Sequence, residues 1–171
     1  MRPQVIAAGV ALTVAAVATA GVLSTGGHSQ PPVARSAPFT LAPVAEGAPE
    51  AALSATPNRP TVLSFFAAWC EPCRRELPLL EAAAAQRGGP DVVGVDFLDQ
   101  RADALDLLAR ARVTFPTGYD HDGEIGRRWA VDGLPVTVFI APGGRVVDYH
   151  RGELRRPELD RLVGRLETSG R

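Results

Sequence analysis

The feature that most constrains this chain of 171 residues is its one pair of cysteines, Cys70 and Cys73, which lie between a predicted strand and a predicted helix. Residues 61–67 are rich in β-branched and aromatic side chains, which predicts a buried strand. Residues 71–86 space leucine and alanine three and four positions apart, which predicts a helix that Gly88 and the glycine after it end. A Cys-x-x-Cys at a strand-to-helix junction is typical of a redox dithiol.

The chemistry of such a pair follows from its place at the helix start. Unpaired backbone N–H groups and the positive end of the helix dipole stabilise a thiolate on Cys70. Cys73 lies one turn later on the same side, so its sulfur can reach that of Cys70. Pro72 sets a helical φ and lacks an N–H that the first turn cannot use. We therefore predict a dithiol that closes and reopens, with Cys70 attacking and Cys73 resolving.

Two other uses of the cysteines fit the sequence less well. A static disulfide across so short a loop constrains the unfolded chain little. A zinc site needs two further ligands, and the three histidines do not repeat a ligand spacing. No metal and no cofactor are therefore expected. A formal net charge of −1 gives no basic footprint, so nucleic acid is not an expected partner. All 18 basic residues are arginine, which excludes lysine-dependent phosphate loops and Schiff-base chemistry.

The amino-terminal residues have the pattern of an export segment. Residues 5–23 carry no charge and follow Arg2. A positive start before an apolar stretch describes a secretory signal peptide, and the stretch is also long enough to span a membrane as an anchor. We expect residues 1–23 to act in one of these ways and to place the rest outside the cytoplasm. Residues 24–36 are rich in Gly, Ser and Pro and predict a flexible linker to a domain over 37–171.

The remainder of the chain alternates strand and helix patterns. Further strands are expected over 91–97, 136–140 and 145–149, and further helices over 101–111, over 124–130 and from residue 157. Residues 141–144, Ala-Pro-Gly-Gly, predict a hairpin turn between the last two strands. Residues 42–60 are expected to be irregular. A βαβ unit followed by a hairpin and a closing helix predicts an α/β fold with a mixed β-sheet sandwiched by helices.

The segment from Ser64 to Pro78 resembles the active-site segment of the thioredoxin-like TlpA/ResA family of extracytoplasmic thiol-disulfide oxidoreductases, with the ResA type closest. Residues 37–41 resemble the family's opening strand, residues 115–120 its central insertion, and residues 133–147 the loop with its cis-proline and the hairpin that follows. The resemblance covers about residues 36–168. It implies a thioredoxin-like fold with an N-terminal extension and a central insertion.

The resemblance also implies roles for single residues. Pro135 matches the cis-proline that faces the two sulfurs and leaves the Leu134 backbone free to pair with a substrate strand. Trp69 is expected on the active-site surface, although a partly buried structural tryptophan also fits. Glu76 matches an acidic residue near the thiols, although a solvated residue of the helix also fits. Thioredoxin itself has a buried acid where this chain has Ser64, so Glu76 is the helix carboxylate expected to take that role.

The charges near Cys70 bear on the direction of electron transfer. Negative charge on Glu71 and Glu76 disfavours a thiolate on Cys70, which favours a reductant over a strong oxidant. Arg74 and Arg75 are expected to form a solvated patch. The resemblance implies reduction of protein disulfides, as in cytochrome c maturation. The expected partners are thiol or disulfide protein substrates, including apocytochrome c, and a membrane protein that supplies electrons.

Two other functions stay open at this point. One is an oxidase that forms disulfides in secreted proteins. Another is a copper-binding chaperone of the Sco type, although its Cys-x-x-x-Cys is one residue longer. A peroxidase is disfavoured, because Ala67 and Leu63 stand where peroxiredoxins have Thr and Pro.

Overall fold

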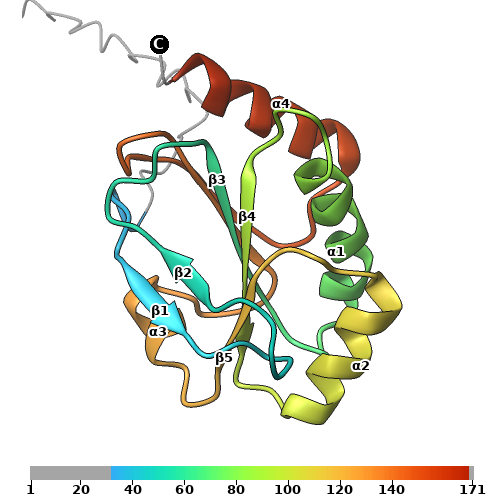
Figure 1. Ribbon diagram of the computed structural model, residues 1–171. Helices are drawn as coiled ribbons and strands as arrows, with labels where there is room; N and C mark the ends of the chain where they lie inside the picture. Colours follow the sequence, from blue (N-terminus) through green and yellow to red (C-terminus); the bar gives the residue numbers. More distant parts are fainter. Residues whose placement is uncertain (1–31, 170–171) are drawn as a thin grey trace, which may run out of the picture.

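The computed structural model describes residues 32–169, and its central sheet contains the predicted strand–helix–strand unit (Figure 1). β3 (Thr61–Phe66) and β4 (Asp91–Phe97) lie parallel and are connected by α1 (Glu71–Ala84). Every residue of β3 is buried, because neighbouring strands flank it and other elements cover both faces. This part of the sequence prediction is confirmed, with α1 ending at Ala84 rather than at residue 86.

The predicted hairpin and closing helix are also present. β6 (Val136–Ile140) pairs antiparallel with β3, and β7 (Val146–Arg151) pairs antiparallel with β6. Gly143 and Gly144 both have positive φ in the connecting turn, a conformation that glycine adopts without strain. α4 (Arg156–Thr168) follows β7. The sheet order is β5-β4-β3-β6-β7, so the expectation of a mixed α/β sheet is confirmed.

The structure adds strands that the sequence patterns did not predict. β5 (Thr117–Asp120) lies at the edge of the sheet, parallel to β4, after the crossover helix α2 (Arg101–Ala111). β1 (Phe39–Leu41), the opening strand that the resemblance implied for residues 37–41, forms an antiparallel pair with β2 (Ala51–Leu53), which was not predicted. The expectation that residues 42–60 are irregular is therefore wrong for β2, whose first and last side chains are buried against the sheet.

Different elements cover the two faces of the sheet. α1, α2 and α4 lie on one face, where Leu77, Leu107 and Leu159 join one apolar core (Figure 1). The short helix α3 (Glu124–Arg128) and the β1–β2 pair cover the other face, where Phe65 and Trp129 belong to a second core. The carboxyl end of β3 leads directly into α1, so the cysteines lie at one end of the sheet, on the first of these faces.

Contacts with the sheet begin before β1. The Val146 amide donates to the Ala34 carbonyl at 3.0 Å, and the Ser36 amide donates to the Gly144 carbonyl at 2.7 Å. Ala34 and Ser36 lie at the end of the linker that is expected over residues 24–36. The export segment expected over 1–23 lies outside the described residues. Among residues 32–169, no helix is both long and apolar enough to cross a membrane.

Candidate active site

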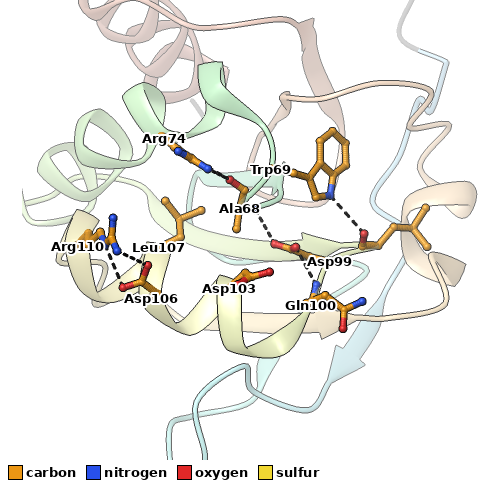
Figure 2. Close-up of a pocket in the computed structure, with 10 residues that line it drawn as sticks. Ala68, Trp69, Arg74, Asp99, Gln100, Asp103, Asp106, Leu107 and Arg110 are labelled. Carbon is orange, nitrogen blue, oxygen red and sulfur yellow. Dashed lines mark hydrogen bonds and ion pairs between the residues drawn. The ribbon is translucent and has the colours of Figure 1, made fainter.

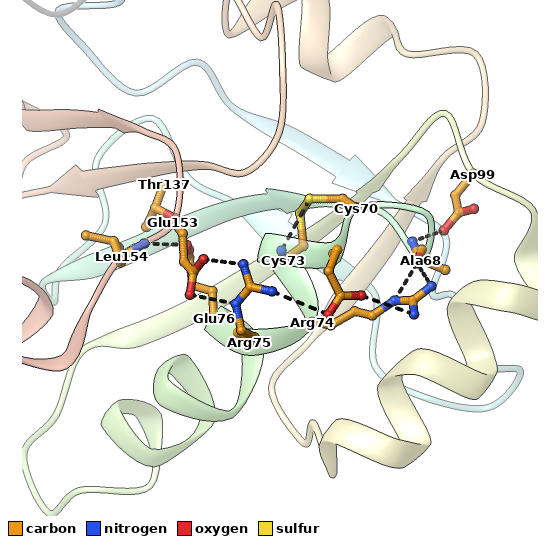
Figure 3. The surroundings of a disulfide bond; sticks show 11 residues. Ala68, Cys70, Cys73, Arg74, Arg75, Glu76, Asp99, Thr137, Glu153 and Leu154 are labelled. Atoms are coloured by element: carbon orange, nitrogen blue, oxygen red, sulfur yellow. Dashed lines mark hydrogen bonds and ion pairs between the residues drawn. A yellow bond between two sulfur atoms is a disulfide. The ribbon is translucent and has the colours of Figure 1, made fainter.

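Cys70 and Cys73 form a disulfide at the start of α1, with their Cα atoms 5.3 Å apart (Figure 3). Cys70 is the N-cap residue, with an extended backbone, and its Sγ accepts a hydrogen bond from the Cys73 amide at 3.2 Å. Pro72 lies in the first turn of the helix, as predicted. Cys70 is 5% exposed and Cys73 is 1% exposed. Cys70 is therefore the sulfur that a partner reaches more easily.

Trp69 lies on the surface beside the disulfide and is 60% exposed, so the surface alternative for this residue is confirmed. Its indole Nε1 donates to the Leu98 carbonyl at 3.4 Å, and the Leu98 side chain is itself exposed. Both residues line a hollow of about 520 Å³ that is also lined by Asp99 and Asp103 (Figure 2). The neighbourhood of Cys70 thus offers apolar side chains next to a partly acidic hollow.

The loop that carries Cys70 is held from two directions through Ala68 (Figure 3). The Ala68 amide donates to Asp99 Oδ2 at 2.5 Å. Its carbonyl accepts from Arg74 Nε at 2.9 Å and from Arg74 Nη2 at 2.6 Å. Arg74 is exposed, as expected of a solvated patch, and its guanidinium also closes the turn around the cysteine loop. Neither Arg74 nor Asp99 was predicted from the sequence to support this loop.

The bond between Leu134 and Pro135 is cis, as the resemblance implied. Val136 pairs with Phe65 of β3, so Pro135 lies at the end of the sheet from which the Cys70 loop departs. Leu134 is half-buried, and neither its amide nor its carbonyl has a hydrogen-bond partner within residues 32–169. These two backbone groups are available to an extended chain laid beside them.

Glu76 lies on the face of α1 that packs against the sheet, and 1% of its surface is exposed. Its Oε1 accepts from the Thr137 hydroxyl at 2.5 Å, and its Oε2 accepts from the Leu154 amide at 2.9 Å (Figure 3). Burial raises the pKa of Glu76 to about 7, and these two donors oppose the rise. A carboxyl with this pKa exchanges a proton near neutral pH, which suits it to general acid–base work.

Glu71 occupies the first turn of α1 and is exposed. Its carboxylate lies 3.4 Å from Arg74 Nη1 and 3.3 Å from Arg75 Nη1. Two neighbouring guanidinium groups compensate its charge, so the expected effect of Glu71 against the Cys70 thiolate loses most of its basis. Of these two carboxylates, Glu76 is then the one whose charge would disfavour the Cys70 thiolate and favour a reductant.

Asp96, at the end of β4, is a second buried carboxyl that the sequence analysis did not single out. It is 0% exposed, and neither carboxyl oxygen has a hydrogen-bond partner within residues 32–169. The pKa of Asp96 is raised to about 8, chiefly by burial and next by the negative charge of Asp99. The signal was present, since an acidic residue interrupts the otherwise apolar second half of a buried strand.

A mixed sheet with a Cys-x-x-Cys disulfide capping the helix after a central strand, and a cis-proline before the neighbouring strand, defines the thioredoxin-like fold. The model of the AhpC/TSA family matches residues 33–149, and the chain belongs to this family.

Named relatives agree with the resemblance to the ResA type. The thiol-disulfide oxidoreductase ResA of Oceanobacillus iheyensis is 33% identical over 122 residues, covering 67% of this chain and 59% of that protein. The thiol:disulfide interchange protein DsbE homolog of Paracoccus denitrificans is 33% identical over 110 residues, covering 63% of this chain and 60% of that protein. The chain thus spans about three fifths of the length of these curated relatives.

A solved structure supports the fold independently. The crystal structure of a putative thiol:disulfide interchange protein DsbE from Chlorobium tepidum superposes with a TM-score of 0.70 at 26% sequence identity. The match covers 78% of this chain and 95% of that one. The expected thioredoxin-like fold is therefore confirmed.

Proposed function

We propose that this chain is an extracytoplasmic thiol-disulfide oxidoreductase that reduces disulfides in exported proteins through Cys70 and Cys73. The observation that carries the proposal is the Cys70–Cys73 disulfide at the N-terminus of α1, with Cys70 as the capping residue. Unpaired N–H groups and the helix dipole at this position favour a thiolate, which is the reactive form of cysteine. The names of the relatives from Oceanobacillus iheyensis and Paracoccus denitrificans support the same chemistry.

The reaction needs two exchange steps. The Cys70 thiolate attacks a substrate disulfide, forms a mixed disulfide and releases one substrate thiolate. Cys73 then loses its proton and attacks the Cys70 sulfur, which releases the second substrate thiolate and closes the Cys70–Cys73 disulfide. Two electrons pass to the substrate, and a partner dithiol later returns two electrons to this chain. Glu76 is the acid–base group proposed to exchange the Cys73 proton.

Binding of the substrate would use the groups around the disulfide. An extended substrate segment pairs with the free backbone groups of Leu134, held in place by Pro135. Trp69 offers an apolar surface to the same segment, and its exposure supports this role. The proposed substrates are protein thiols or disulfides, with the Cys-x-x-Cys-His of an apocytochrome c as the leading case. The proposed electron donor is a membrane protein.

The proposed location follows from the amino-terminal sequence. Residues 1–23 would be a membrane anchor or a cleaved signal peptide, residues 24–36 a linker, and residues 37–171 the redox domain. A reporter that matures only after export, fused after Arg171, is expected to be active. Activity of a reporter that works only in the cytoplasm, fused at the same place, would contradict this topology.

The alternatives can be separated from the main proposal. A disulfide-forming oxidase uses the same cysteines in the reverse direction, and the reduction potential of the pair decides between the two. A copper chaperone needs a third ligand, whereas no three His, Cys, Asp or Glu side chains within residues 32–169 are placed to hold a metal ion. Titration of the reduced chain with copper ions is expected to give no stoichiometric complex. Ala67 beside the cysteine loop gives no support to a peroxidase.

The experiment that tests the proposal is trapping of the mixed disulfide. The substrate is a peptide with the Cys-x-x-Cys-His sequence, oxidised to its internal disulfide. Cys73→Ser is expected to accumulate a covalent complex through Cys70, whereas Cys70→Ser accumulates far less, because Cys73 is almost fully buried. The double variant is the control and should trap nothing. Equal trapping by the two single variants would overturn the roles assigned to the cysteines.

A further inference from the structure

The proposed thiol chemistry does not account for the buried carboxyl of Asp96. Asp96 pairs with Phe66 across the parallel strands β3 and β4, at the end of the sheet where the cysteine loop begins. Its side chain is fully buried, and both oxygens lack a hydrogen-bond partner within residues 32–169. A buried polar group in this condition destabilises the folded state. A group that costs stability at this place is a candidate for a role in the reaction.

The surroundings of Asp96 connect it to Cys70. Alternate residues of a strand point to the same face, so Asp96 lies on the sheet face that Val92 shares with α1 and α2. Asp99, three residues further along the chain, binds the Ala68 amide at 2.5 Å, two residues before Cys70. Among the charged neighbours of Asp96, Asp99 has the largest influence on its pKa. A short chain of groups thus runs from Asp96 through Asp99 to the cysteine loop.

Three charged groups influence the pKa of Asp96: Asp99 from the loop after β4, Arg101 from α2, and Asp120 from β5, whose carboxylate accepts from the Ile125 and Gly126 amides on the other face of the sheet. The cation among them is engaged elsewhere, because Arg101 Nη1 donates to the carbonyls of Pro43 and Val44 at 2.9 and 2.8 Å. No hydrogen bond joins Arg101 to Asp96 within residues 32–169. Two negative neighbours and burial favour an uncharged Asp96, whose pKa burial raises to about 8.

We propose that Asp96 is a positioning residue whose proton keeps the Asp99 carboxylate on the Ala68 amide and thereby keeps the negative charge beside Cys70 low. The proposal rests on the proposed function in one respect, namely that Cys70 is the attacking sulfur. While Asp96 is protonated, Asp99 is the only one of these two carboxyl groups that carries a negative charge. When Asp96 ionises, two carboxylates repel each other at low dielectric, and the repulsion acts on the contact between Asp99 and Ala68.

The coupling between Asp96 and Cys70 is reciprocal. A charge on Asp96 disfavours the Cys70 thiolate, and a thiolate on Cys70 favours the protonated form of Asp96 to the same extent. The step involves only a proton, which solvent can supply or accept. Asp99 lines the hollow of about 520 Å³ beside the loop, which gives solvent a path to the pair (Figure 2).

The test measures the alkylation rate of Cys70 by iodoacetamide against pH. It uses the reduced full chain with Cys73→Ser, so that Cys70 is the only thiol, and compares it with the same chain carrying Asp96→Asn. At about pH 6 the two should react equally, because position 96 is uncharged in both. At about pH 8 and above, the chain with Asp96 should react about two- to tenfold more slowly, because its additional charge disfavours the thiolate.

The matched control is Asp103→Asn, which removes an exposed acidic charge that lines the same hollow. It should leave the pH dependence unchanged. Two results overturn the proposal: equal rates for Asp96→Asn and its parent at every pH, or a ratio that is the same at every pH, which indicates a structural role only. The assay needs no protein substrate, so a failure to trap a mixed disulfide counts against the proposed function and leaves this comparison intact.

A second measurement does not depend on how Asp96→Asn folds. The infrared spectrum of Glu76→Gln, which lacks the other carboxyl whose pKa burial raises, should contain the C=O band of a protonated carboxyl at neutral pH. The band should disappear as pH rises through about 8, the pKa of Asp96. Absence of the band at neutral pH overturns the proposal.

Discussion

Glu76 and Asp96 are two buried carboxyls on the same face of one sheet, on opposite sides of β3. Glu76 reaches Thr137 of β6, and each of its oxygens accepts a hydrogen bond. Asp96 belongs to β4, and neither of its oxygens has a hydrogen-bond partner within residues 32–169. Both are at most 1% exposed, so burial alone does not distinguish them. Their hydrogen-bond donors do.

The proton affinity of a buried acid depends on the donors that bind its charged form as well as on burial. Burial is the largest cause that raises the pKa of either group. The Leu154 amide and the Thr137 hydroxyl bind the charged form of Glu76 and hold its pKa at about 7. Asp96 has no such donors and a negative neighbour, and its pKa is about 8. Glu76 therefore suits proton exchange during turnover, whereas Asp96 suits retention of a proton.

The two buried carboxyls should have their largest effect on how the free energy of unfolding depends on pH. Both pKa values are raised above the ordinary values of 4.5 for Glu76 and 3.8 for Asp96. The folded chain therefore keeps protons that the unfolded chain releases, and the free energy of unfolding falls as pH rises through this window. Each group contributes up to about 1.4 kcal/mol per pH unit, Glu76 until about pH 7 and Asp96 until about pH 8.

Urea unfolding at a series of pH values checks this prediction. Asp96→Asn should flatten the profile from about pH 4 up to about pH 8. Glu76→Gln should flatten it only up to about pH 7, so that between about pH 7 and pH 8 only the first variant changes the slope. If the two variants flatten the same interval, the assigned order of the two carboxyls is wrong.

The sequence predicted the parts of this site that depend on local pattern. The strand before the cysteines, their place at a helix start and the hairpin after Pro135 follow from neighbouring residues or from short motifs. The partners of Glu76 do not, because Thr137 and Leu154 lie 61 and 78 residues away in the chain. The helix pattern places Glu76 on the stripe of Cys73 and Leu80 that faces the core, but it does not show which groups bind the carboxyl there.

The missed elements have a similar cause. β5 consists of Thr-Gly-Tyr-Asp, which lacks alternating apolar residues and forms a strand because the open edge of β4 pairs with it. The second half of β4 was expected to be a buried strand. The complete burial of the Asp96 carboxyl, however, depends on α2 and β5, which come later in the chain and pack against β4 or pair with it. Arg74 looked like a surface residue, and only the folded turn brings the Ala68 carbonyl to its guanidinium.

The next largest effect is expected from removing one donor to Glu76. Thr137→Val leaves Glu76 Oε1 without its hydrogen bond and should lower the free energy of unfolding by about 1–3 kcal/mol. The loss should be greater above about pH 7, where Glu76 is charged, than at about pH 5. Urea unfolding at both pH values measures this. Thr137→Ser, which keeps the hydroxyl, is the control, and equal losses for the two variants would show that the hydroxyl does not bind a charged Glu76.

A smaller effect is expected on the redox couple itself. A charged Glu76 disfavours the Cys70 thiolate, so Glu76→Gln should make the couple more oxidising, by up to about 30 mV, which corresponds to about 1.4 kcal/mol. The shift should vanish well below pH 7, where Glu76 carries a proton. Equilibration against glutathione or dithiothreitol measures both chains. The reduction potential of the unchanged chain should be nearer ~ −270 mV than ~ −120 mV. A potential near ~ −120 mV would favour the disulfide-forming oxidase.

The smallest effect is expected from the exposed carboxylate nearest to Cys70 in sequence. Glu71 follows Cys70 directly, but it lies in solvent and its charge is shared with Arg74 and Arg75. Exposed pairs of this kind contribute little, so Glu71→Gln should move the potential by less than about 10 mV at any pH. The same equilibration, run beside Glu76→Gln, tests it at low and high salt. If Glu71→Gln shifts the potential as far as Glu76→Gln does, the distance along the chain, and not burial, decides how strongly a carboxylate affects the reduction potential. The contrast between buried and exposed carboxyls then no longer explains the direction of electron transfer.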